Sequence, residues 1–586
     1  MAKVYVIPLT SIYIYILFFL LLTHKTKYSI QYCHYSTPQK KHIFSVLTKK
    51  KIKLKVENEK PKIDNNIINY FKNIRNEYPF FKNKSDLFYF DNAATTQKPE
   101  SVIRSITQFY TSENANIHRG IYKLSLQATD NYENVRTIVK EYINCEHPEE
   151  IIFTTGCTHG YNIACSIIFD QVIKTPNDEI YLSYLEHNSN IVPWQEEIRK
   201  RKKGKIKYVP LKKSGYINIK KLLTRINSNT KVFSLNHVSN VLGHIQNINV
   251  LIKKVKEINP NIVIIIDAAQ SFPHMKYNIK KMLQNNIKID ILITSGHKFC
   301  APLGCGFIYI NKQLTTLYKF KPLLYGSNII TTVKKYKSEY VLSPYVYEPG
   351  TQNISSILAM GVALKYLKKI NIKHVHTYEM YLYDLLIYYL RIYMGNSLVE
   401  LPTLKSSSSK FSNSGYKLNI SNDHINDTND INDTNDTNDI NDINDINDIN
   451  DINDINDIND INDINDVNSN MQTSYMQNDN ILPNQVQEKT KFQLFIHNSR
   501  KYNLKKIGIL PIWSNNFTAF DLATFLDFKN ICIRSGHHCA SLLHKYILNI
   551  SESARVSIFF YNTPEEIKYL AKQIANVSFM LNKMKK

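Results

Sequence analysis

The sequence predicts an α/β protein built on a mostly parallel sheet with helices on both faces. Short apolar runs of strand length recur at 150–155, 179–183, 231–235, 261–267 and 289–294. Polar segments of helical length separate them, and this alternation is typical of parallel sheets covered by helices. The chain has 586 residues, of which 43% are hydrophobic, enough for a large core and two domains.

The N-terminal residues form a leader that precedes the fold. Residues 4–22 are an apolar run, and a single spanning helix needs about 20 apolar residues, so a membrane anchor is one interpretation. The absence of a second such run favours a signal sequence over residues 1–22. The segment 23–65 is basic, and its part from Thr23 to Val56 holds nine lysines and no acid. It resembles the transit part of a two-part leader for a secondary plastid such as the apicoplast, with mitochondrial or plain secretory delivery as alternatives.

Two of the predicted strands are followed by polar residues of types that act in catalysis or bind cofactors. Ligands of parallel sheets bind beyond the carboxyl ends of the strands. Asp267 ends one apolar run, where it is either a helix N-cap or a carboxylate that holds a protonated ring nitrogen. Lys298 follows the next run, in one turn with Ser295 and His297. Pyridoxal phosphate needs a lysine for its Schiff base and donors for its phosphate.

Two earlier strand ends add weaker signals. His187 follows the run at 179–183, and its neutral imidazole is suited to stack on an aromatic ring and carry protons, with a purely structural histidine as the alternative. Thr158 follows Gly156 where the first strand leads into a helix. Backbone N–H groups at a helix N-terminus bind phosphate.

With two further motifs, these residues resemble a cysteine desulfurase, a fold-type-I pyridoxal-phosphate enzyme. The motifs are Arg-Ser-Gly-His-His-Cys-Ala at 534–540 and Glu-Pro-Gly-Thr-Gln-Asn at 348–353. The first is similar to the signature of the SufS-like group, also called group II, and the plastid (apicoplast) type is the nearest fit. Enzymes of group I, such as IscS and NifS, have a longer loop around their cysteine. The resemblance runs from Tyr89 to Thr563, apart from an insertion in the middle.

The resemblance implies a role for each motif residue. Lys298 would bind pyridoxal 5'-phosphate as a Schiff base, Asp267 would pair with the ring nitrogen, and Cys539 would be the nucleophile. The other implied cofactor contacts are His187, which is also counted as catalytic, Gln270, Thr158, Ser295, His297 and, from the other subunit, Thr351. The substrate carboxylate would be bound by Asn240 and Arg555.

Three positions depart from the family pattern. Cys157 stands where threonine is common, Gln352 where proline is common, and Asn188 in place of a second histidine. None of these departures affects Lys298, Asp267 or Cys539, on which the resemblance chiefly rests.

The implied function is conversion of L-cysteine to L-alanine with a persulfide on Cys539, which supplies sulfur for iron–sulfur cluster assembly in the SUF pathway. A homodimer, a SufE-like sulfur acceptor and a SufBCD-like scaffold are the implied partners. A selenocysteine lyase of the same fold remains an alternative. A membrane-anchored scaffold protein is a second alternative, from a different class, but it leaves the residues at the strand ends unexplained.

The predicted domains follow from the resemblance and from composition. The resemblance implies an N-terminal segment, 66–89, that packs with the small domain, a large cofactor-binding domain, 90–362, with a seven-stranded sheet, and a small α+β C-terminal domain, 363–404 and 491–586. The insertion at 405–490 includes an Ile-Asn-Asp repeat whose period fits neither helix nor strand. The insertion is predicted to be disordered and to lie at the surface. A Ca²⁺ loop does not fit, because the repeat at 421–470 has no glycine and the wrong spacing.

Charge and cysteine content exclude several other classes. The net charge of +23 comes from lysines spread along the chain, without zinc-finger spacing or an arginine-rich arm, so no nucleic-acid partner is predicted. The eight cysteines form no Cys-x-x-Cys pair, and no metal site is predicted. No stable membrane association is expected after the leader is removed.

Overall fold

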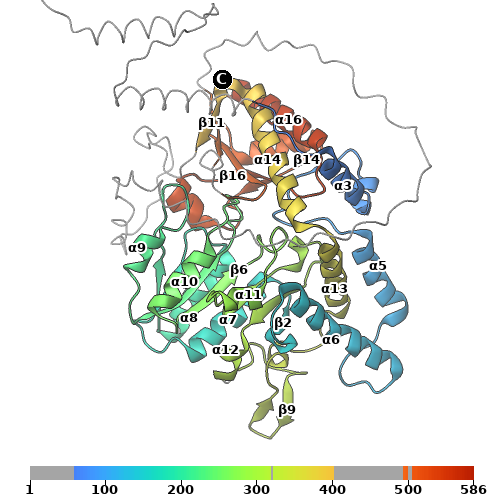
Figure 1. Cartoon of the computed structure of the whole chain (residues 1–586), viewed down its shortest axis with the longest axis vertical. Coiled ribbons are helices and arrows are strands. Elements are labelled where there is room, and N and C mark those ends of the chain that lie inside the picture. The colour runs from blue at the N-terminus through green and yellow to red at the C-terminus, as the bar shows by residue number, and fades with distance from the viewer. Residues whose placement is uncertain (1–58, 318–320, 402–491, 499–504, 586) are drawn as a thin grey trace, which may run out of the picture. The chain divides into compact units, whose positions relative to one another are not determined.

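The structure is a computed structural model that describes residues 59–317, 321–401, 492–498 and 505–585 (Figure 1). The chain divides into two units, Met1–Lys60 and Pro61–Lys586, and the fold described here is that of the second unit. The predicted signal sequence, nearly all of the basic leader and the predicted insertion at 405–490 lie outside the described residues.

A seven-stranded sheet forms the centre of the larger part of this unit. Its strands lie in the order β2 (Ile151–Thr154), β8 (Gly306–Ile310), β7 (Ile291–Ile293), β6 (Val263–Asp267), β5 (Thr230–Asn236), β3 (Glu179–Leu182) and β4 (Lys205–Tyr208). Only β8 runs antiparallel to its two neighbours, and the other pairs are parallel. The predicted fold class is confirmed, and each of the five apolar runs is a strand.

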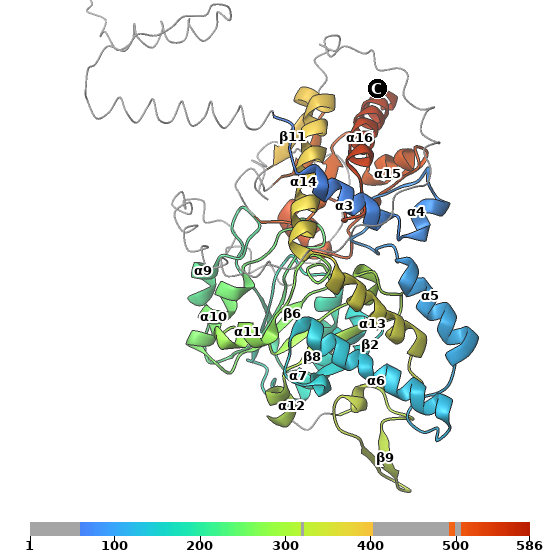
Figure 2. The same ribbon diagram turned by 45° about the vertical axis from the view of Figure 1, so that its right-hand side comes forward.

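Both faces of this sheet are apolar, as in parallel sheets that helices cover on both sides. Along β6, Val263 and Ile265 pack in the same cluster as α7 (Cys157–Gln171) and α8 (Val192–Arg201). The alternate residues, Ile264 and Ile266, pack in the cluster that contains residues of α6 (Lys123–Ile143), α10 (Ile248–Ile258) and α13 (Ile354–Lys369). In Figure 2, α13 lies beside α6 and α5 (Glu100–Gln108).

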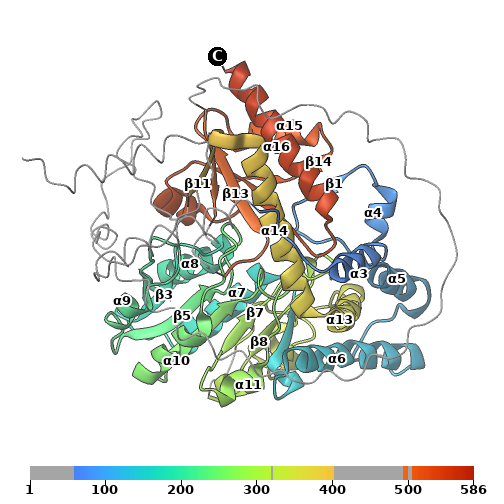
Figure 3. The same ribbon diagram turned by 45° about the horizontal axis from the view of Figure 1, so that its top comes forward.

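A second, mixed sheet lies in the C-terminal part. Its order is β11 (Leu398–Leu401), β12 (Leu494–His497), β13 (Ile509–Ser514), β16 (Ser553–Ser557) and β15 (Arg534–Gly536). The strands β11 and β12 pair in parallel, and residues 402–491, which are outside the described part of the chain, separate them in the sequence. The long helix α14 (Ile372–Met394) packs against α16 (Pro564–Met584), and α15 (Ala519–Asp527) also packs on α16 (Figure 3).

The N-terminal segment joins this C-terminal part. The strand β1 (Phe88–Tyr89) pairs in parallel with β14 (Ile531–Cys532). In α3 (Asn65–Arg75), Arg75 donates to a carboxylate oxygen of Glu566 at 2.6 Å. The remaining elements are α4 (Pro79–Asn83), α9 (Ile219–Leu223), α11 (Ile279–Gln284), α12 (Lys312–Leu317) and the hairpin of β9 (Ile330–Val333) and β10 (Ser338–Tyr340). Among the described residues, no helix is both long and apolar enough to cross a membrane.

Candidate active site

Asp267 and Lys298 lie at the carboxyl ends of the adjacent parallel strands β6 and β7. Asp267 is buried and accepts a hydrogen bond from the backbone N–H of Ala269 at 2.8 Å. Lys298 lies in a single turn of 3₁₀ helix, Gly296–Lys298, directly after β7. Burial raises the pKa of Asp267 and lowers the pKa of Lys298, while their mutual attraction opposes both shifts. The carboxylate and the amine therefore face one space, in which the amine loses its proton more readily than in water.

Two of the side chains predicted to bind phosphate, Thr158 and Ser295, lie at the start of α7. Thr158 is hydrogen-bonded to the hydroxyl of Ser189, with 2.8 Å between the two oxygens. Gly156 has φ +140°, and a Cβ at this position would lie 3.2 Å from Oγ of Ser295. The Nδ1 atom of His297 is buried and has no hydrogen-bond partner among the described residues. The free N–H groups of the helix start, the two hydroxyls and this unpartnered ring nitrogen form a donor set suited to a phosphate.

His187 is held as a neutral ring near the same space. Its Nδ1 accepts the backbone N–H of Ser189 at 3.1 Å, so the ring hydrogen must be on Nε2. Burial, with the charges of Lys298, Arg555 and Arg534, lowers the pKa of His187 to about 3. Gln270 is buried and donates from Nε2 to the carbonyl of Ala93 at 2.8 Å, which fixes its side chain.

Arg555 and Asn240 form a second group of buried polar side chains. The NH1 group of Arg555 donates to the backbone carbonyl of Asn240 at 3.0 Å, and its NH2 group donates to Asp91 at 3.1 Å. The Nε atom of Arg555 and the Oδ1 atom of Asn240 are buried and lack partners among the described residues. The Nε–H group of Arg555 can donate to a carboxylate, as the prediction requires, whereas Oδ1 of Asn240 only accepts and is available to a donor group of a ligand.

Cys539 lies in an exposed loop after β15. Its charge, when the thiol is ionised, raises the pKa of both Lys298 and Arg555. The sulfur of Cys539 is therefore close enough to Lys298 and Arg555 to interact electrostatically with both. Cys157 is a second thiol near Lys298, but burial and the charge of Asp267 raise its pKa well above the usual range. At neutral pH, Cys157 remains a thiol.

Thr351 is the predicted site residue that the single chain does not bring to the others. It is exposed, and no hydrogen bond within the described part of the chain joins it to another predicted site residue. The loop that carries it is anchored by Glu348, which pairs with Arg136 at 2.5 Å in the interior. The prediction that it serves the other subunit stays a prediction.

Four residues around the site have contacts that sequence reasoning did not identify. They are Asp91, which pairs with Arg555, and His538, His544 and Ser553 behind Cys539. His538 lies inside the motif at 534–540, and Asp91 lies two residues after Tyr89, where the family resemblance begins. These positions were the available signal for the two residues. For His544 and Ser553 the sequence offered no signal.

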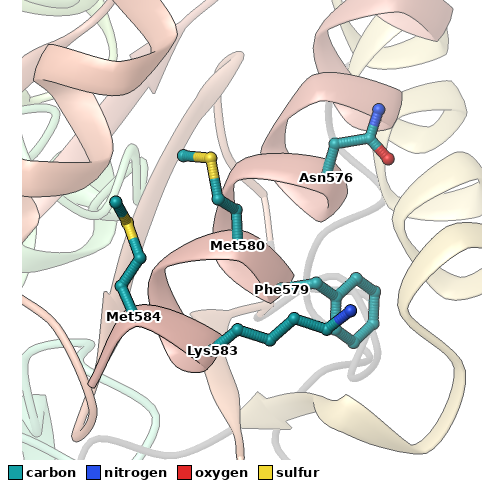
Figure 4. A pocket seen from close by; sticks show the side chains of 5 residues that line it. All are labelled: Asn576, Phe579, Met580, Lys583 and Met584. Carbon is teal, nitrogen blue, oxygen red and sulfur yellow. The ribbon is translucent and has the colours of Figure 1, made fainter. Parts of the chain in front are cut away.

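A separate recess lies on the last turns of α16 (Figure 4). Its volume is about 500 Å³, and it is lined by Asn576, Phe579, Met580, Lys583 and Met584. It contains none of the residues predicted to act on a ligand, and the strand ends of the large sheet remain the candidate active site.

Comparisons with known proteins show the family and the fold of the chain. The class-V aminotransferase family matches residues 88–413 and 469–570. The protein designated PbSufS in Plasmodium berghei is 55% identical over 570 residues, which cover 97% of this chain and 98% of that one. The cysteine desulfurase SufS of Plasmodium falciparum is 53% identical over 587 residues and 98% of both chains. In fold, the chain resembles an apo cysteine desulfurase from Thermococcus onnurineus, with a TM-score of 0.62 and 23% identity over 87% of this chain and 97% of that one.

Proposed function

The chain belongs to the class-V aminotransferase family and, within it, to the SufS cysteine desulfurases, and on this premise we propose that it converts L-cysteine to L-alanine and keeps the sulfur on Cys539 as a persulfide. The observation that carries the proposal is the convergence of three side chains from separate segments. Asp267 and Lys298 follow adjacent strands, and Cys539 comes from a loop more than 200 residues further along the sequence.

Pyridoxal 5'-phosphate fits the residues present at this site. Lys298 would hold the cofactor covalently, with the carboxylate of Asp267 at the ring nitrogen, Gln270 at the ring hydroxyl and the flat neutral ring of His187 stacked on its face. Thr158, Ser295 and the unpartnered nitrogen of His297 would hold its phosphate. When bound, the cofactor supplies an electron sink conjugated to the α-carbon of the substrate.

The amine of Lys298 serves as the base in this proposal. Burial lowers its pKa, so a neutral amine is available to take the proton from the α-carbon of the substrate. Asp267 faces it, and the attraction between the two favours the carboxylate form that a protonated ring nitrogen needs. Arg555 orients the substrate by donating its Nε–H group to the carboxylate. Asn240 would donate to the same carboxylate through its Nδ2 group, which in the free chain bonds the carbonyl of His538.

Cys539 receives the sulfur directly from the substrate. Its ionised sulfur attacks the sulfur of L-cysteine, so that a sulfur–sulfur bond forms as the carbon–sulfur bond of the substrate breaks. The electron pair stays with the β-carbon, which takes up a proton and becomes the methyl group of alanine. Splitting the transfer into two steps is the advantage of a covalent intermediate.

The wider setting belongs to the same proposal. The chain acts as a homodimer in which Thr351 of the partner subunit completes the phosphate site, and the domains have the boundaries given above. A SufE-like acceptor and a SufBCD-like scaffold take the sulfur on to iron–sulfur cluster assembly. The signal sequence and basic leader direct the protein to the plastid, the apicoplast. The SufS names of the Plasmodium relatives and the composition of the leader support this setting.

The test is a comparison of the purified protein with two variants. The unmodified protein is expected to show the visible absorption of bound cofactor and to form alanine from L-cysteine. Cys539→Ala should keep that absorption and form no persulfide, while Lys298→Ala should lose both the normal absorption and turnover. Normal turnover in either variant contradicts the proposal.

A further inference from the structure

The three successive carbonyl groups at 538–540 all accept hydrogen bonds from other parts of the chain. The donors are the Asn240 side chain to His538 at 2.7 Å, the Asn188 backbone N–H to Cys539 at 2.7 Å and Nδ1 of the His544 ring to Ala540 at 3.1 Å. His538 and Cys539 have φ values of +52° and +55°, which are unfavourable for residues other than glycine. The contacts therefore maintain a backbone conformation that this stretch would rarely adopt alone.

Ser553, in β16, joins two histidines behind this loop. Nε2 of His538 lies 2.9 Å from the carbonyl oxygen of Ser553 and 3.2 Å from its hydroxyl. A carbonyl only accepts, so this nitrogen must carry the hydrogen. The same reasoning puts the hydrogen of His544 on Nδ1, which faces the carbonyl of Ala540 at 3.1 Å. Nε2 of His544 is then free to accept the hydroxyl of Ser553 at 3.0 Å.

The donors and acceptors therefore form a chain with one direction. It leads from His538 to Ser553, from Ser553 to His544 and from His544 to Ala540. It begins at the residue before Cys539 and ends at the residue after it. The link from Ser553 to His544 needs an unprotonated Nε2 on His544, and burial supplies this condition because it lowers the pKa of His544 to about 4.

We propose that His544 and Ser553 are positioning residues for the sulfur-accepting Cys539. They act through the His538 side chain and the Ala540 carbonyl, whereas Asn240 holds the carbonyl of His538. Misplacing a reacting atom by about 1 Å is enough to lower a rate roughly 100-fold. This inference rests on the proposed function, in which Cys539 attacks the substrate sulfur.

The test uses the full chain with bound cofactor and two single variants. His544→Phe removes both polar contacts of the ring, and its kcat for alanine formation should fall roughly 10- to 100-fold. Ser553→Ala should fall less, because its backbone carbonyl still accepts from His538. In both variants the KM for L-cysteine and the cofactor absorption should stay unchanged, since neither residue touches substrate or cofactor in this account.

Two further variants separate positioning from folding. His544→Asn keeps a donor where Nδ1 stood and should recover most of the kcat lost in His544→Phe. Ser578→Ala is the matched control, because it removes another buried serine hydroxyl, one without a hydrogen-bond partner among the described residues. It should leave kcat unchanged. The double variant His544→Phe/Ser553→Ala should lose no more than His544→Phe alone, because both act on one hydrogen-bond chain.

The outcomes also distinguish this inference from the proposed function. If Cys539→Ala forms alanine at the full rate, the proposed function fails. If Cys539→Ala is inactive but His544→Phe keeps full kcat, only the positioning role is overturned. Additive losses in the double variant, an equal loss in Ser578→Ala, or no recovery in His544→Asn overturn it as well.

Discussion

Arg555 offers the sharpest test of substrate binding. It is 2% exposed, and two of its nitrogens are already committed, one to Asp91 and one to the carbonyl of Asn240. Its Nε lacks a partner among the described residues and is the donor available to a substrate carboxylate. In Arg555→Lys a single ammonium replaces the planar group and has too short a reach to serve three directions at once.

The size of the effect follows from the hydrogen bonds lost. A hydrogen bond that involves a charged group contributes about 1.5–3 kcal/mol, and about 1.4 kcal/mol corresponds to a factor of ten. Loss of one such bond to the substrate therefore predicts a fall in kcat/KM of roughly 10- to 100-fold. Most of this fall should appear as a higher KM, because the substrate carboxylate is bound equally in the ground state and in the transition state.

The assay is alanine formation as a function of L-cysteine concentration. Arg534→Lys is the matched control, since Arg534 lies 3.8 Å from the same Asp91 but its side chain is 49% exposed. Exposed ion pairs contribute about 0–1 kcal/mol, so this variant should change kcat/KM by no more than a few-fold. An unchanged KM in Arg555→Lys, or equal effects in the two variants, would refute the assignment.

Two further predictions concern stability. Glu348→Ala leaves the buried guanidinium of Arg136 without its bidentate partner and should lower the free energy of unfolding, measured with urea, by about 3–5 kcal/mol. The double variant Arg136→Met/Glu348→Leu should lose less, because it leaves no buried charge unpaired. A larger loss in the double variant than in Glu348→Ala would contradict this reasoning. Burial raises the pKa of Glu186 from 4.5 to about 8, so between these values the folded state binds a proton that the unfolded state has lost. The contribution of this carboxyl to the free energy of unfolding is fully present below pH 4.5 and decreases as the pH rises to about 8, by up to about 1.4 kcal/mol per pH unit. In Glu186→Gln the free energy of unfolding, measured with urea at several pH values between 5 and 8, should no longer show this decrease with pH. The same decrease in the variant and in the unmodified protein would contradict the prediction.

The sequence predicted the centre of the large sheet better than its edges. The run that became β6 consists of β-branched and apolar residues because both of its faces are covered by helices. The edge strand β4 reads Lys-Ile-Lys-Tyr and is only half-buried, so it carries no continuous apolar run. The antiparallel direction of β8 depends on which strands it pairs with, and composition holds no information on such pairing.

The same difference applies to the site. Lys298 and Asp267 were identifiable because each follows directly after an apolar strand, and Cys539 because it stands in a short motif. Asp91 meets Arg555 across 464 positions of sequence, and only the folded chain brings the two together. His544 is a single histidine in a short π-helical turn, Leu543–Leu548, and its role depends on which atoms its two nitrogens face.

The central claim is that Cys539 receives the sulfur of L-cysteine. The most direct measurement adds L-cysteine to the protein, blocks free thiols and determines by mass spectrometry which cysteine carries an extra sulfur atom. The account predicts that sulfur on the peptide with Cys539, formed together with alanine. Alanine without sulfur on Cys539, or sulfur found instead on Cys157 or Cys532, which are also partly accessible, would contradict it.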